Sequence, residues 1–113
     1  MENKIRIRPV EGTWVVRAGG AVLGETSRAR ELDEPGRKPV VYFPREDIAM
    51  AFLERSDHHT TCPLKGQASY YSIQTKSTLI ENAGWSYENP FDEVADIGGF
   101  LAFYEDKVTV EKV

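Results

Sequence analysis

Residues 14–25 read Trp-Val-Val-Arg-Ala-Gly-Gly-Ala-Val-Leu-Gly-Glu, and this stretch decides the class of fold. Two runs of β-type residues flank the pair Gly19-Gly20. Both central residues of a type I′ turn have positive φ, which glycine adopts without a steric penalty. The stretch therefore predicts a β-hairpin that turns at the two glycines.

Further strands are predicted on both sides of this hairpin. Residues 4–10 alternate between apolar and basic side chains, which is typical of a half-buried strand. Pro9 indicates a sheet edge, because proline has no N–H to donate to a neighbouring strand. Residues 27–39 are charged and broken by Pro35-Gly36, so we expect a turn or a mobile loop at the tip of this segment. The other strand-like runs are residues 40–43, 58–62 (strand or loop), 69–73, 78–80 and 85–87, with a closing hairpin over 100–110.

Two segments have features of helices. Residues 44–55 begin with proline and carry Glu46 and Asp47 in the first turn, where the helix dipole favours negative charge. Apolar residues share one face of this segment, so we expect an α-helix that lies on a sheet. Residues 89–99 begin with Asn89 as a predicted N-cap and Pro90 at the first helical position, and they end with a Gly-Gly pair, which predicts a short helical turn.

These elements predict a mainly β fold that forms one domain over residues 1–113. Two antiparallel sheets would meet around a core, with one α-helix packed on one side and the short helical turn beside it. A chain of 113 residues is long enough to bury a hydrophobic core without a disulfide or a structural metal.

Composition narrows the classes of function. The net charge is −4, from 18 acidic and 14 basic residues, which argues against nucleic acid as a partner. The chain has one cysteine, Cys62, so an intramolecular disulfide is impossible and a thiolate zinc site is unsupported. No apolar stretch approaches the length of a membrane span, and the N-terminus lacks a secretory leader. We therefore expect a cytoplasmic protein that does not bind membranes.

The turn at residues 62–66, Cys-Pro-Leu-Lys-Gly, presents Lys65 beside a cluster of aromatic residues. One interpretation is a connector with a solvated lysine; the other is a lysine that faces an anion. Trp85 and Tyr87 share a face of one strand, and Tyr70 lies on a neighbouring run. We expect these aromatics, with Lys65 or Arg17 at the rim, to line a pocket for a small planar or anionic ligand.

Catalytic and metal-binding alternatives use the same region. Cys62 and His59 suggest a thiol nucleophile, but residues three apart on a strand point to opposite faces. The adjacent pair His58-His59 cannot ligate one metal from a regular strand for the same reason. We predict no metal and no cofactor, and the interpretation left open is an enzyme of undefined reaction class that uses Lys65, His59 or Cys62.

Several motifs, taken in order, indicate a family. They are the runs VYFPRED at residues 41–47, CPLKG at 62–66, ASYY at 68–71, WSYENP at 85–90, LAFY at 101–104 and VTV at 108–110. The chain resembles the bacterial and fungal domain-of-unknown-function family catalogued as number 427, which is sometimes labelled nucleotidyltransferase-like. The resemblance implies a β-tent-like fold, shared with B-type methionine sulfoxide reductases and the ligand-binding domain of cereblon. The paired Cys-x-x-Cys zinc motifs of many β-tent proteins are absent, and so is the Asp-x-Asp motif of nucleotidyltransferases.

Three functions remain open at this point. The first is a domain that binds a small molecule, the second is the enzyme described above, and the third is a homo-oligomeric interaction module such as a homodimer. Exposed strand edges in a small β domain favour the third, because an unpaired edge can add a strand from another copy.

Overall fold

Antiparallel strands make up most of the chain in the computed structural model, which describes residues 4–113. The described part holds ten strands and three short 3₁₀ helices. The strands are β1 (Arg6–Pro9), β2 (Trp14–Ala18), β3 (Ala21–Thr26), β4 (Arg30–Asp33), β5 (Val40–Tyr42), β6 (Leu53–Cys62), β7 (Gly66–Gln74), β8 (Leu79–Ser86), β9 (Ala102–Phe103) and β10 (Thr109–Lys112). The 3₁₀ helices are η1 (Arg45–Asp47), η2 (Met50–Phe52) and η3 (Asp92–Ile97).

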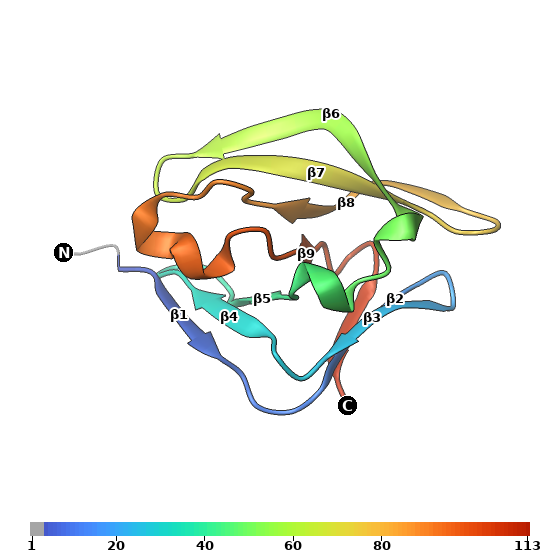
Figure 1. The fold of residues 1–113 in the computed structure, drawn as a ribbon, viewed down its shortest axis with the longest axis horizontal. Coiled ribbons are helices and arrows are strands. Elements are labelled where there is room, and N and C mark those ends of the chain that lie inside the picture. Colours follow the sequence, from blue (N-terminus) through green and yellow to red (C-terminus); the bar gives the residue numbers. More distant parts are fainter. Residues whose placement is uncertain (1–3) are drawn as a thin grey trace.

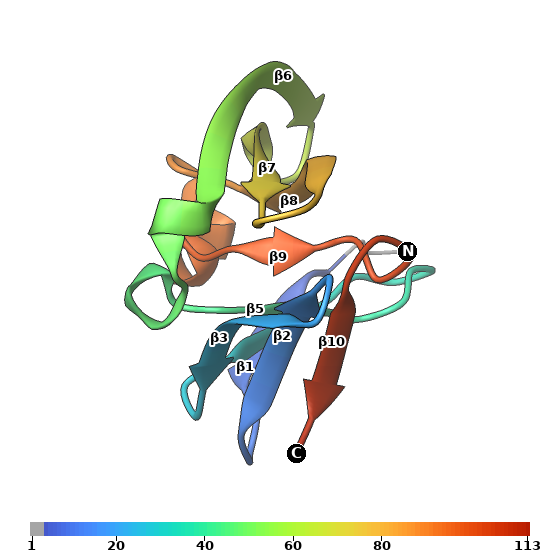
Figure 2. The ribbon, with the colours of Figure 1, turned by 90° about the vertical axis from the view of Figure 1, so that its right-hand side faces the viewer.

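The strands form three sheets, so the prediction of two sheets is wrong while that of a mainly β, antiparallel fold is confirmed. Their orders are β1-β4-β5, β10-β2-β3 and β6-β7-β8-β9. In Figure 1 the strands β6, β7 and β8 lie together at one side of the molecule. Figure 2 shows β9 between these strands and the sheet of β2, β3 and β10.

The hairpin of residues 14–25 is confirmed. β2 pairs with β3, Ala18 is opposite Ala21, and the intervening Gly19 and Gly20 have φ of 54° and 83°. The edge position of Pro9 is confirmed as well, because β1 is the outer strand of its sheet.

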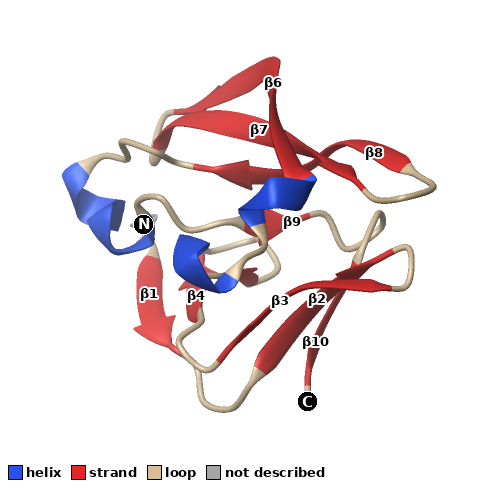
Figure 3. Cartoon of the chain, turned by 45° about the vertical axis from the view of Figure 1, so that its right-hand side comes forward, coloured by secondary structure: helices blue, strands red, loops and turns tan. Residues whose placement is uncertain are grey.

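The predicted α-helix over residues 44–55 is wrong. The described residues contain only 3₁₀ turns, and Figure 3 shows η1 and η2 as separate short coils. Ile48 is extended (φ −109°, ψ 137°) because its backbone bridges to Gly24 of β3, and the N–H of Ala49 donates to Leu23 O at 2.7 Å. A Cβ at Gly24 would lie 2.6 Å from Asp47 O, so glycine permits this close approach. Leu53 then begins β6, the longest strand.

One other local prediction fails for a reason of pairing, and two hold. The strands over residues 100–110 do not form a hairpin, because β9 pairs with β8 and β10 pairs with β2. The turn expected at Pro35-Gly36 does form: it joins β4 to β5, Gly36 has a φ of 81°, and the N–H of Arg37 donates to Glu34 O at 3.0 Å. The short helical turn near the asparagine–proline pair does form, as η3, and its N-cap is Phe91 rather than Asn89.

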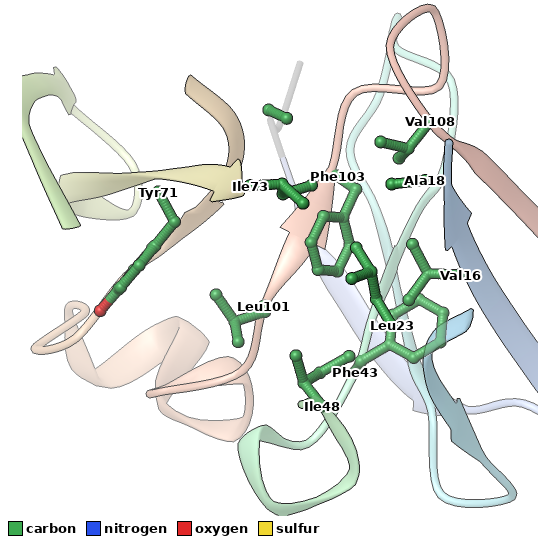
Figure 4. Packing of buried hydrophobic residues seen from close by; sticks show 11 residues of the cluster. Val16, Ala18, Leu23, Phe43, Ile48, Tyr71, Ile73, Leu101, Phe103 and Val108 are labelled. Carbon is green, nitrogen blue, oxygen red and sulfur yellow. The ribbon is translucent and has the colours of Figure 1, made fainter. Parts of the chain in front are cut away.

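Two hydrophobic clusters hold the sheets together. Figure 4 shows the first, in which Leu23, Phe43 and Phe103 pack beside the β2–β3 hairpin, and the rings of Phe43 and Phe103 meet edge-on with centroids 6.0 Å apart. The second cluster includes Leu32, Tyr42, Tyr70 and Tyr87 and is contacted by Trp85, so its aromatic members border the cavity described below. In residues 4–113, no helix has the length and apolar character needed to cross a bilayer.

Candidate functional site

A cavity of about 450 Å³ lies between the β4–β5 loop, the β6–β7 turn and one face of β7 and β8. This volume is within the range of about 300–1,000 Å³ that is usual for small-molecule sites. Its walls are aromatic and its remaining lining is charged or aliphatic: Leu32, Glu34, Arg37, Lys38, Val40, Tyr42, Lys65, Tyr70, Trp85, Tyr87 and Tyr104.

The aromatic walls are held by ring contacts and hydrogen bonds. The Trp85 ring meets the Tyr42 ring edge-on (88°), and its Nε1–H donates to the Tyr42 hydroxyl at 3.2 Å. On its other side Trp85 lies 4.6 Å from the ring centroid of Tyr104. Tyr104 stacks on Tyr70 at 13°, with their hydroxyls 3.4 Å apart. The cavity therefore presents fixed, flat apolar faces, which suit a planar ligand.

An ion pair is built into the same wall. Lys65 Nζ lies 2.7 Å from Glu34 Oε1, and the two side chains are only 10% and 13% exposed. The ammonium also lies 5.9 Å from the centroid of the Tyr87 ring. Lys65 is therefore not a solvated lysine on a connector, because its side chain is nearly buried. It is not an unpaired cation either, because Glu34 neutralises its charge.

The lining has a positive balance. Three cations, Arg37, Lys38 and Lys65, stand against the single carboxylate of Glu34, whereas the whole chain has a net charge of −4. Glu34 Oε1 is paired with Lys65, and Glu34 Oε2 lies 3.8 Å from Arg37 Nε. Arg37 and Lys38 on the β4–β5 loop therefore supply the positive charge that an incoming anion would meet.

Three phenols of the cavity, those of Tyr42, Tyr87 and Tyr104, remain neutral at physiological pH. Burial raises the pKa of Tyr42 and of Tyr87 above its ordinary value of 10.0, and the hydrogen bond from Trp85 offsets this in part at Tyr42. Burial, followed by the hydrogen bond with Tyr70, raises the pKa of Tyr104 to about 12. None of these three hydroxyls therefore adds a negative charge that would oppose an anion.

Four of the five predicted ligand-binding residues line this cavity together: Lys65, Tyr70, Trp85 and Tyr87. Arg17 does not, because it lies on β2 in another sheet and pairs with Glu111 at 2.7 Å. Sequence reasoning missed Tyr104 and three residues of the segment between β4 and β5, where a turn or a mobile loop was expected: Glu34, Arg37 and Lys38. The only sequence signal that these three loop residues could belong to a site is the high density of charged residues around Pro35-Gly36.

The residues of the enzyme hypothesis are dispersed. His59 is exposed on β6, Cys62 packs half-buried against the second hydrophobic cluster, and neither lines the cavity that contains Lys65. Within residues 4–113, no group of three or more His, Cys, Asp or Glu side chains is placed to hold a metal ion.

A second polar cluster, the Arg45 clamp (Arg45, Tyr71, Ser86 and Glu88), lies outside the cavity. Arg45 Nη2 is 2.9 Å from both oxygens of Glu88, and the Tyr71 hydroxyl donates to Glu88 Oε2 at 2.7 Å. Arg45 also donates to Gly99 O at 3.1 Å. Burial alone would lower the pKa of the Arg45 guanidinium, but Tyr71 and Glu88 outweigh it and raise that pKa. All three guanidinium nitrogens have partners within the protein, so the clamp ties segments together.

Fold and cavity define a small antiparallel β domain whose aromatic pocket carries positive charge. A sequence model of the family described as Domain of unknown function (DUF427), NTP_transf_9, matches residues 6–113, and the chain belongs to this family. The match confirms the resemblance that the ordered motifs predicted. No curated protein matches the chain.

Proposed function

We propose that the cavity binds a small planar anion. The observation that carries this proposal is the pairing, in one cavity, of flat aromatic walls with three cations against one carboxylate. A planar ring would stack against Trp85 and Tyr104, and a carboxylate or phosphate on that ring would face Arg37 and Lys38 at the loop.

The rigidity of the walls supports this assignment. Trp85 is fixed on one side by its hydrogen bond to Tyr42 and on the other by contact with Tyr104. A ligand that enters such a preformed site loses less free energy to ordering of the protein. The enzyme hypothesis has less support, since two of its three residues lie outside the cavity. The homo-oligomer hypothesis is supported only by the presence of edge strands such as β6 and β1.

The test is a titration with benzoate, followed by thermal unfolding and by the change in tryptophan fluorescence, to which Trp85 in the cavity and Trp14 outside it both contribute. Cyclohexanecarboxylate, which has the same charge without a flat ring, and benzyl alcohol, which has the ring without the charge, are the comparison ligands. We expect benzoate to raise the unfolding temperature in a concentration-dependent way and to bind more tightly than either comparison ligand. Equal responses to all three compounds would remove the proposal.

Two pairs of variants locate the site. The double variant R37Q/K38Q should weaken benzoate binding by roughly two- to thirtyfold, the product expected for two exposed charges. R17Q removes an arginine outside the cavity and should leave the affinity unchanged. Y104A should cost about two- to twelvefold through the lost ring contact. F91A, which removes an exposed aromatic outside the cavity, is its control.

A further inference from the structure

The Lys65–Glu34 ion pair occupies part of a cavity that is otherwise suited to a ring with one negative charge. Resting on the function proposed above, we propose that this pair recognises a lactam edge, meaning the adjacent C=O and N–H of a cyclic amide, on a planar heterocyclic anion. Lys65 would donate to the lactam oxygen and Glu34 would accept from the lactam N–H.

The hydrogen-bonding capacity of the pair is only partly used. An ammonium carries three N–H donors, and among the described residues the only hydrogen bond from Lys65 Nζ goes to Glu34 Oε1. The second carboxylate oxygen, Glu34 Oε2, is 3.8 Å from Arg37 Nε, which is too long for a hydrogen bond. The cavity wall therefore offers unused donors on Lys65 beside an unused acceptor on Glu34.

A purely structural role does not account well for this pair. Removing two charges from water costs several kcal/mol per ion, and well-packed apolar residues at such positions are often as stable. Both side chains are nearly buried, and their immediate surroundings include the ring of Tyr87. Burying an ion pair at this place therefore has a large free-energy cost, and both of its residues line the cavity.

The pair is also held in a fixed orientation. The N–H of Lys65 donates to Cys62 O at 3.3 Å, which closes the β6–β7 turn, and Lys65 O accepts from the N–H of Phe91 at 3.0 Å. On the opposite side the N–H of Arg37 donates to Glu34 O at 3.0 Å, which closes the β4–β5 loop. The donor and the acceptor therefore lie on two turns that backbone hydrogen bonds hold in place. A site that forms hydrogen bonds to a ligand discriminates strongly against analogues that lack the matching groups.

The experiment compares orotate, a planar carboxylate with lactam edges, with benzoate, which has no lactam, and with 1,3-dimethylorotate, in which both N–H groups are blocked. We expect the wild-type protein to bind orotate roughly 5- to 150-fold more tightly than benzoate, as expected for two additional hydrogen bonds. Blocking the nitrogens should abolish this preference. The comparison uses the unmodified chain, so it decides the question even if a variant fails to fold.

The variant E34L/K65M removes both members of the pair together and leaves no buried charge without a partner. In this variant the preference for orotate over benzoate should disappear, so that the ratio of the two affinities falls to about one whatever the change in each. Binding of orotate, 1,3-dimethylorotate and benzoate with equal affinity would overturn the lactam inference but keep the planar-anion site. Binding of none of them would overturn both. An orotate preference that persists in E34L/K65M would show that other residues recognise the lactam, which also overturns this inference.

Discussion

The Arg45–Glu88 pair of the clamp should contribute far more to stability than an exposed ion pair of similar length. The perturbation is a double-mutant cycle that consists of R45M, E88Q and the combined variant. Both side chains are about one-third exposed, at 33% and 29%, and the Glu88 carboxylate accepts hydrogen bonds from Arg45 and from Tyr71.

The magnitude follows from burial and from the number of charged hydrogen bonds. Exposed ion pairs contribute about 0–1 kcal/mol, whereas breaking a buried pair by removing one partner costs about 3–5 kcal/mol. With one-third of each side chain exposed, the Arg45–Glu88 coupling energy should be about 2 kcal/mol. R45M alone should cost about 3 kcal/mol, because Gly99 O also loses its donor.

The assay is equilibrium unfolding in urea, followed by circular dichroism. With a slope of roughly 1.5 kcal/mol per molar urea, a loss of about 3 kcal/mol lowers the midpoint of unfolding by about 2 M. The control is the same cycle on Arg17 and Glu111, which lie 2.7 Å apart but have side chains that are 45% and 43% exposed. That cycle should give less than about 1 kcal/mol.

The comparison between the two cycles is decisive. A coupling energy for Arg45 and Glu88 that is no larger than that of Arg17 and Glu111 would refute the reasoning, since the distances are nearly equal and only burial and the additional partners differ. An unchanged slope in all variants is required for the comparison, because a changed slope would mean that the surface exposed on unfolding has changed.

Two pH-dependent effects should accompany these results. The Thr26 hydroxyl, followed by Arg28, holds the pKa of Asp47 below its ordinary value of 3.8, so the stability that Asp47 contributes is present above about pH 4 and is lost as the pH falls. Urea midpoints of wild type and D47N should therefore converge below pH 4, and a constant difference down to pH 2 would contradict this. At the other extreme, the pKa of Tyr104 is raised to about 12, so its neutral form favours the folded state and that contribution is lost as the pH rises above 10. Ultraviolet titration of Y104F should lose amplitude near pH 12, and a loss of amplitude near pH 10 instead would exclude the shift.

Sequence reasoning succeeded where the interaction is local. The hairpin at Gly19-Gly20 follows from turn chemistry alone, since two consecutive positive φ angles require residues of this kind. The edge position of Pro9 follows from its missing N–H. Both predictions depend on a few consecutive residues, whose conformational preferences no distant contact has to override.

The failures share a single cause, which is pairing between residues distant in the chain. Residues 44–55 have a helical pattern, yet Ile48 bridges to Gly24 and thereby interrupts the helix. The two strands near the C-terminus are adjacent in sequence, but one pairs with β8 and the other with β2. For the cavity, the aromatics were predictable because they cluster in sequence. Glu34 was not, because its partner Lys65 is 31 positions away.

The clamp and the cavity use alternate residues of the same two strands. Tyr70 and Trp85 are register partners on β7 and β8 and line the cavity, whereas their neighbours Tyr71 and Ser86 contact Arg45. Successive side chains of a strand point to opposite faces, so a slip of one residue would exchange cavity residues with clamp residues. The hydrogen bonds of Arg45 oppose such a slip. The clamp therefore stabilises the alignment on which the aromatic walls depend, although none of its side chains lines the cavity.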